Sequence, residues 1–106
     1  MDRPIKNVVT DEAFSSKYGL CSANSVNWGR IAAQTAHFYF AYFQACRMAG
    51  LPVGSPIDFA LPTGAMGNVT AGLVARLTGL PIRRFICATN ANDIVHRAFT
   101  TGNFFK

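Results

Sequence analysis

Two short, mostly apolar segments, each followed by a helical pattern, constrain the possible fold of this chain more than any other feature of its sequence. Residues 57–61 and 84–88 read as strands. Helices are predicted over residues 68–77 and 92–101, and a glycine soon after each one stops it. Strand, helix, strand and helix in this order form a βαβα unit with parallel strands and a right-handed crossover. The predicted fold class is therefore α/β, with a parallel sheet covered on both faces.

One long helix is predicted before this unit. It starts at a cap formed by Asn24 or Ser25 and ends at Gly50, because the Leu51-Pro52 pair prevents continuation. Aromatic side chains cover much of its surface, and its polar residues fall on one narrow stripe that consists of Gln34, His37 and Gln44. A helix with this distribution is expected to be buried on most of its sides.

The residues before the long helix are predicted to form an extended segment and one short helix. Residues 5–9 read as extended. The short helix starts at a cap on Thr10 or Asp11 and stops at Gly19. Its acidic residues lie in the first turn, which favours the helix because they face the positive end of the helix dipole.

Composition indicates a single partial domain. The chain has 106 residues, of which 50% are hydrophobic and 14% are charged. These values exclude a disordered tail and indicate more apolar surface than so short a chain easily buries. Residues 1–50 are expected to form a helical segment and residues 51–106 the βαβα unit with its glycine-rich loop. The apolar surface predicts a need for a partner, and a homo-oligomer is one form of it.

The net charge of +5 does not by itself indicate a nucleic-acid surface. The basic residues are scattered, and only Arg83 and Arg84 are adjacent, whereas a nucleic-acid surface typically clusters lysines and arginines. A membrane span is not expected either, because Arg30, Gln34 and His37 interrupt the long helix. We therefore expect neither nucleic acid nor a membrane as a partner.

The cysteines and the first residues bear on location. Cys21, Cys46 and Cys87 form no metal-binding pattern and are expected to be reduced thiols, without a metal. No apolar segment of a signal peptide follows Met1. These features predict a cytoplasmic protein.

The stretch LPTGAMGNVTAG, residues 61–72, places three glycines and a proline between the first strand and its helix. Glycine has no Cβ, so main-chain N–H groups can approach an anion at the start of a helix. The loop matches neither the lysine-containing phosphate loop nor the dinucleotide fingerprint. It predicts a phosphate held by main-chain amides, with the side chain of Asn68 or Thr63 helping. An ordinary strand-to-helix connection is the alternative.

Parallel strands end at the same edge of a sheet. The loops at residues 62–68 and 89–93 are therefore expected to line one crevice, which is where α/β sheets bind ligands. Within the second loop, Asn90, Asn92 and Asp93 are expected to be cap and loop residues. Arg83, Arg84, His96 and Arg97 are expected to lie at the surface or at an interface.

Four motifs together are specific for one family. They are NSVNWGR at the start of the long helix, PTGAMGN with AG shortly after it, GLPIRRF, and ATNANDIVHR. In order and spacing they resemble those of the threonine synthase family, over about residues 4–104, and the resemblance is closest to its threonine synthase-like branch. Those proteins are pyridoxal-phosphate enzymes of the tryptophan-synthase β-subunit type, fold type II. The resemblance implies that fold and that cofactor.

The resemblance also implies site residues. In the family, a Gly-Asn-Phe-Gly-Asn or -Asp motif holds the cofactor phosphate, and the matching residues here are Gly64, Ala65, Met66, Gly67 and Asn68. Alanine and methionine replace the common asparagine and phenylalanine, which keeps the main-chain donors but removes a side-chain amide and an aromatic ring.

The NSVN motif is implied to lie near the cofactor or substrate, with Ser25 and Asn27 as the substrate-binding candidates. Helix capping is the alternative for Asn24 and Ser25. Asn27 is expected to lie inside the first turn of the helix, so capping explains it less well.

The implied substrates are phosphorylated hydroxy-amino acids of the O-phosphohomoserine or phosphothreonine type, and the implied reaction is phosphate elimination to a keto acid or replacement to threonine. Family chemistry requires a Schiff-base lysine in a segment N-terminal to these motifs, and Lys6, Lys17 and Lys106 lie outside such a motif. The chain alone is therefore expected to be inactive, and no catalytic residue is assigned. The alternative is a truncated, non-enzymatic isoform that acts through protein contacts and is secreted without a signal peptide.

Overall fold

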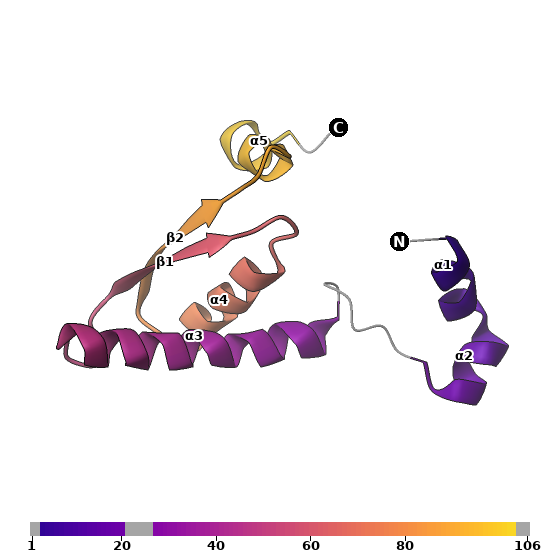
Figure 1. Cartoon of the computed structure of the whole chain (residues 1–106), viewed down its shortest axis with the longest axis horizontal. Helices are drawn as coiled ribbons and strands as arrows, with labels where there is room; N and C mark the ends of the chain where they lie inside the picture. Colours follow the sequence, from indigo (N-terminus) through magenta and orange to yellow (C-terminus); the bar gives the residue numbers. More distant parts are fainter. Residues whose placement is uncertain (1–2, 21–26, 104–106) are drawn as a thin grey trace.

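A computed structural model of the chain describes residues 3–20 and 27–103. In chain order the elements are α1 (Arg3–Thr10), α2 (Glu12–Tyr18), α3 (Trp28–Ala49), β1 (Ile57–Pro62), α4 (Gly67–Leu77), β2 (Ile82–Ala88) and α5 (Ile94–Thr101) (Figure 1). The predicted βαβα unit is confirmed, and the chain is mixed α/β.

The two strands pair in parallel, as the sequence predicted. Phe59 lies opposite Phe85, and Leu61 lies opposite Cys87. The register shifts between Ile57 and Asp58, so that Asp58 is opposite Arg84 and Arg83 is the extra residue of a bulge. The carboxyl ends of β1 and β2 therefore lead into the two loops that the sequence placed at one edge.

The core lies between α3, α4 and one face of the sheet. Its buried members are Phe38, Tyr42, Cys46, Ala71, Ala75, Leu80 and Ile82. The Phe38 ring centre is 5.1 Å from that of Phe59 and 6.3 Å from that of Phe85. Phe38 of α3 thus packs onto both strands. Aromatic pairs at such distances add to the stabilisation that comes from burial.

Only one face of the sheet is covered by the described residues, so the predicted cover on both faces is wrong for this part of the chain. Ile86 lies on the opposite face from Phe85 and is 54% exposed. In Figure 1 α3 and α4 lie on the same side of the strands, and α5 follows the end of β2 at a distance from α3. The continuous apolar strand pattern is present, but the second covering layer is not among the described residues.

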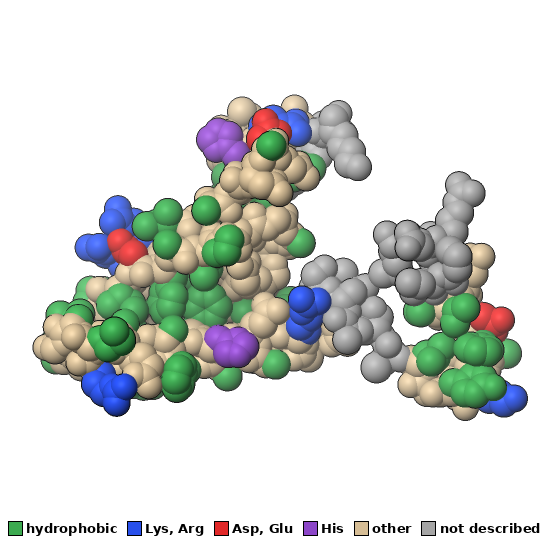
Figure 2. Space-filling model, in the orientation of Figure 1, with side chains coloured by type: hydrophobic (Ala, Val, Ile, Leu, Met, Phe, Trp, Pro, Cys, Tyr) green, Lys and Arg blue, Asp and Glu red, His purple; other side chains and the backbone are tan. Residues whose placement is uncertain are grey.

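The prediction that the long helix is buried on most of its sides is also wrong here. Phe40 is 67% exposed and Met48 is 84% exposed, because α4 and the sheet contact α3 along one side. Figure 2 shows hydrophobic side chains at the surface along this helix.

The start of α3 differs from the predicted one. Asn24 and Ser25, the predicted caps, lie outside the described residues. The cap of α3 is Asn27, which has extended φ and ψ and accepts a hydrogen bond from the Gly29 amide at 2.8 Å through its side-chain oxygen. Asn27 therefore precedes the first turn instead of lying inside it. Gly50 ends the helix in the left-handed conformation, as predicted.

The N-terminal segment is helical where an extended stretch was predicted. Residues 5–9 belong to α1, and Pro4 is accommodated because the amides of a first helical turn have no intrahelical acceptor. The short helix that follows is confirmed as α2, with Asp11 as its cap and Gly19 left-handed at its end. In Figure 1 α1 and α2 lie apart from the body formed by the other elements.

Gly72 permits the closest contact between α4 and the core. A Cβ at this position would lie 2.6 Å from Phe85 Cε1 and 2.7 Å from Phe38 Cε1, distances that carbon atoms do not tolerate. Any larger residue would therefore force both rings out of place, which explains the glycine that follows Ala71 in the sequence.

We predict that Gly72→Ala destabilises the chain, because overpacking costs about 1–3 kcal/mol and exceeds the gain of about 1 kcal/mol in helix propensity. A lower melting temperature by circular dichroism checks this. Gly64→Ala is the control, since a Cβ there meets no atom within 4 Å. Equal melting temperatures for the two variants would contradict the packing described here.

Tyr42 fixes the turn after α3. Its buried hydroxyl accepts a hydrogen bond from the Gly54 amide at 2.8 Å and donates one to the Ser55 carbonyl at 3.1 Å. Burial raises the pKa of the Tyr42 hydroxyl above its ordinary value. The hydroxyl therefore stays protonated and serves as donor and acceptor at once.

Tyr42→Phe should lower the free energy of unfolding by about 1–3 kcal/mol, because it leaves a buried donor and acceptor without partners. Tyr39→Phe removes a hydroxyl that bonds to Thr78 at the surface, where water replaces it, and should cost clearly less. Urea denaturation of both variants checks this. A larger loss for Tyr39→Phe would show that the turn does not depend on Tyr42.

Candidate functional site

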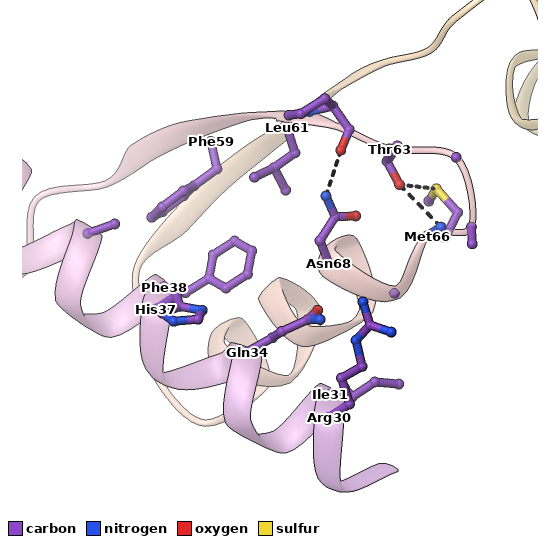
Figure 3. Close-up of a pocket in the computed structure, with 15 residues that line it drawn as sticks. Arg30, Ile31, Gln34, His37, Phe38, Phe59, Leu61, Thr63, Met66 and Asn68 are labelled. Carbon is purple, nitrogen blue, oxygen red and sulfur yellow. Dashed lines mark hydrogen bonds between the residues drawn. The ribbon is translucent and has the colours of Figure 1, made fainter. Parts of the chain in front are cut away.

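A cavity of about 600 Å³ opens between the glycine-rich loop and the first half of α3. Figure 3 shows the loop on one side and the helix on the other. All five predicted cofactor-binding residues border this cavity: Gly64, Ala65, Met66, Gly67 and Asn68. Its volume lies within the range of about 300–1,000 Å³ that is usual for pockets that bind small molecules.

The loop begins as a continuation of the sheet. The Thr63 amide donates to the Ala88 carbonyl at 2.9 Å, which extends the strand pairing past β1. The chain then turns, and Met66 takes φ 60° and ψ 4° as the residue that precedes α4. A side chain at positive φ costs about 1–2 kcal/mol, and such residues are concentrated at functional sites.

Four of the residues that line the cavity have main-chain amides without a hydrogen-bond acceptor in the part of the chain that the structure describes: Gly64, Ala65, Gly67 and Asn68. The Met66 amide between them is engaged, since it donates to Thr63 Oγ1 at 3.2 Å. The first amides of a helix lack intrahelical acceptors and carry the positive end of its dipole. This arrangement suits a bound anion.

The Asn68 side chain closes the loop rather than facing a ligand with free polar atoms. Its Nδ2 donates to the Pro62 carbonyl at 2.7 Å, and its Oδ1 accepts from the Val69 amide at 2.9 Å. Both polar atoms are thus used within the chain. What Asn68 offers to the cavity is its main-chain amide.

The opposite wall comes from α3 and was not predicted as functional. Arg30, Gln34 and His37 line the cavity at successive turns of one helix face, and Figure 3 shows the Arg30 side chain rising toward the start of α4. The Gln34 Oε1 atom is buried and has no hydrogen-bond partner among the described residues. Buried acceptors are normally paired. The predicted polar stripe was the signal for this wall, since it contains Gln34 and His37.

The predicted crevice between two loops is only half correct. The loop at residues 62–68 borders the cavity, but residues 89–93 are not among its lining residues. In that loop Asn90 and Asn92 accept hydrogen bonds from nearby amides, and Asp93 pairs with Arg97. The cavity forms instead between the glycine loop and α3, which packs against one face of the sheet.

The described residues include only one of the two substrate-binding candidates, Asn27. Ser25 lies outside the described residues, and Asn27 caps α3 and is not among the lining residues. Their role toward a substrate therefore stays a prediction.

A charged cluster lies at the other end of the strands. Arg83 donates two hydrogen bonds of 2.8 Å to Asp58, and Arg84 donates two more, of 2.8 and 3.3 Å. The bulge at Arg83 allows both arginines to reach one carboxylate. Hydrogen bonds from Arg83, and then from Arg84, hold the pKa of the Asp58 carboxyl far below its ordinary value.

The described ranges, residues 3–20 and 27–103, contain neither a membrane span nor a metal cluster. None of their helices combines the length and the apolar character that a membrane span needs. No group of three or more His, Cys, Asp or Glu residues there could hold a metal ion.

Comparison with known proteins gives a consistent set of relatives, although no protein-family model matches the chain. The chain is 45% identical over 104 residues, 98% of its length, to human threonine synthase-like 2. It is 43% identical over the same length to threonine synthase-like 2 of Xenopus laevis. To human threonine synthase-like 1 it is 39% identical over 106 residues.

The chain spans only part of these relatives. The match covers 21% of threonine synthase-like 2 and 14% of threonine synthase-like 1.

The Asp58 cluster predicts an acid sensitivity. Because the carboxyl has a lower pKa in the folded chain, its stabilisation is present above the unfolded pKa of about 3.9 and is lost as the pH falls toward the folded pKa. Asp58→Asn should thus show a smaller drop in melting temperature between pH 7 and pH 3 than the unchanged chain. Asp93→Asn, which removes an exposed ion pair, should behave like the unchanged chain. The same drop in all three proteins would contradict the assignment.

Proposed function

Since the chain is homologous to one segment of the threonine synthase-like proteins, we propose that it provides the phosphate-holding wall of a pyridoxal-phosphate site. The observation that carries the proposal is the group of four main-chain amides at one cavity, none with an acceptor in the described residues. A phosphate ester offers acceptor oxygens that match such donors without a lysine beside them.

The residues of this chain fit that group. The glycine loop carries alanine and methionine where the family commonly has asparagine and phenylalanine, but the donors are main-chain atoms and do not depend on those side chains. When bound, pyridoxal phosphate supplies an electron sink for bonds at the α carbon of an amino acid. The loop would hold and orient the phosphate, and Phe38 and Phe59 would provide an apolar wall beside it.

For the substrate we propose a phosphorylated hydroxy-amino acid of the O-phosphohomoserine or phosphothreonine type. The support is the Arg30 guanidinium at the same cavity, because guanidinium groups recognise phosphate through paired hydrogen bonds. The reaction of the whole enzyme would be loss of phosphate to a keto acid, or replacement to threonine. This chain would contribute binding and orientation, and by itself would not catalyse the reaction.

A second candidate function is binding of another polypeptide. The observation in its favour is the exposure of large apolar side chains on α3, such as Phe40 and Met48. A purified chain that elutes as a monomer and melts cooperatively would support this function. Aggregation would instead indicate that these faces need the rest of a longer protein.

A phosphate titration followed by amide NMR tests the main proposal. With pyridoxal phosphate or inorganic phosphate, the amides of Gly64, Ala65, Gly67 and Asn68 should shift, whereas pyridoxal without phosphate should leave them unchanged. Shifts confined to other parts of the chain would contradict it.

A matched pair of substitutions at Ala65 sharpens this test. Ala65→Asp places a carboxylate beside the amides, and two like charges about 4 Å apart cost about 1 kcal/mol even in water, so phosphate affinity should fall at least about fivefold. Ala65→Asn has the same shape without the charge and should keep the affinity. Equal affinities for the two variants would show that phosphate does not bind at this loop.

A further inference from the structure

We propose that Thr63 is a positioning residue for the glycine loop: its buried hydroxyl holds Met66 in the left-handed conformation that keeps the loop amides at one cavity. This inference rests on the proposed function, because its consequence for a ligand is the grip of those amides on phosphate. Thr63 directly precedes the five residues, 64–68, that match the phosphate-holding motif of the family.

Thr63 is itself firmly placed. It is 9% exposed and is the buried polar residue of the described chain. Its amide donates to the Ala88 carbonyl at 2.9 Å, which anchors it to the sheet. Its hydroxyl oxygen accepts from the Met66 amide at 3.2 Å, and the hydroxyl approaches Met66 Sδ at 3.8 Å. One side chain thus contacts both the main chain and the side chain of Met66, as Figure 3 shows.

Met66 needs such a restraint. Among the described residues it is the only one other than glycine with positive φ, a conformation that L-amino acids avoid. Its carbonyl accepts hydrogen bonds from the Thr70 amide at 2.8 Å and the Thr70 hydroxyl at 2.9 Å, so Met66 also starts α4. A return of Met66 to negative φ would rotate the chain between Ala65 and Gly67. The amides of Gly64 and Ala65 would then be separated from those of Gly67 and Asn68.

The nature of this restraint gives a suppressor test. Glycine adopts positive φ without steric cost, so a chain with glycine at position 66 should no longer need the Thr63 hydroxyl. A purely structural role of Thr63, through its amide bond to Ala88, would not be relieved by that change.

The experiment measures inorganic phosphate binding at the loop amides by NMR for the full chain and four variants. Thr63→Val keeps the shape but removes the hydroxyl, and should weaken binding about five- to thirtyfold, the equivalent of the strain of one left-handed residue. Thr63→Ser keeps the hydroxyl and should bind as the unchanged chain does. Met66→Gly is the reference for the double variant, because glycine removes the strain at this position whatever the effect of the lost side chain on affinity. The double variant Thr63→Val/Met66→Gly should bind phosphate within about twofold of Met66→Gly.

A second readout separates this proposal from the proposed function. The nuclear Overhauser effect between the Met66 amide and its own Hα is strong at positive φ, and it should weaken in Thr63→Val but not in Thr63→Ser. Absence of phosphate binding in the unchanged chain would overturn the proposed function, and this readout would then decide the role of Thr63. An unchanged Overhauser effect in Thr63→Val would overturn the proposed role of Thr63. Clearly weaker phosphate binding by the double variant than by Met66→Gly, while Thr63→Ser binds as the unchanged chain does, would also overturn the proposed role of Thr63.

Discussion

The contact of Phe38 with both strands is the interaction on which the rest of this structure depends. It sets α3 against the sheet, and Gly72 makes it possible because no Cβ stands between α4 and the two rings, Phe38 and Phe85. With α3 held there, the helix face that carries Arg30 and Gln34 lies across from the glycine loop. A core contact between aromatic rings therefore creates the second wall of the cavity.

Much of the fold could be predicted from local patterns. The strands, α4 and the glycine stops follow from apolar runs and from residues that tolerate left-handed φ, such as Gly50. The misplaced start of α3 had a local cause as well, because three residues of one motif can each cap a helix and only the geometry selects Asn27. The burial of individual side chains on α3 could not be predicted. An aromatic residue such as Phe40 has the pattern of a core residue whether or not a neighbouring element covers it.

Part of the candidate site was also predictable from local sequence patterns. Glycine spacing and the family motif pointed to residues 64–68, and these residues border the cavity. The wall from α3 was missed because it depends on tertiary packing. Its residue Gln34 lies 30 positions before Gly64 of the loop in the sequence. The left-handed Met66 was missed because no propensity rule places methionine at positive φ; only a specific partner such as Thr63 allows it.

In the proposed site, main-chain amides rather than charged side chains hold a phosphate at the start of α4. An experimental structure of the chain with pyridoxal phosphate tests this most directly. We expect phosphate oxygens within hydrogen-bond distance of the four loop amides, those of Gly64, Ala65, Gly67 and Asn68. A phosphate bound instead at the Asp58, Arg83 and Arg84 cluster, with the loop amides turned to acceptors of the chain, would contradict it.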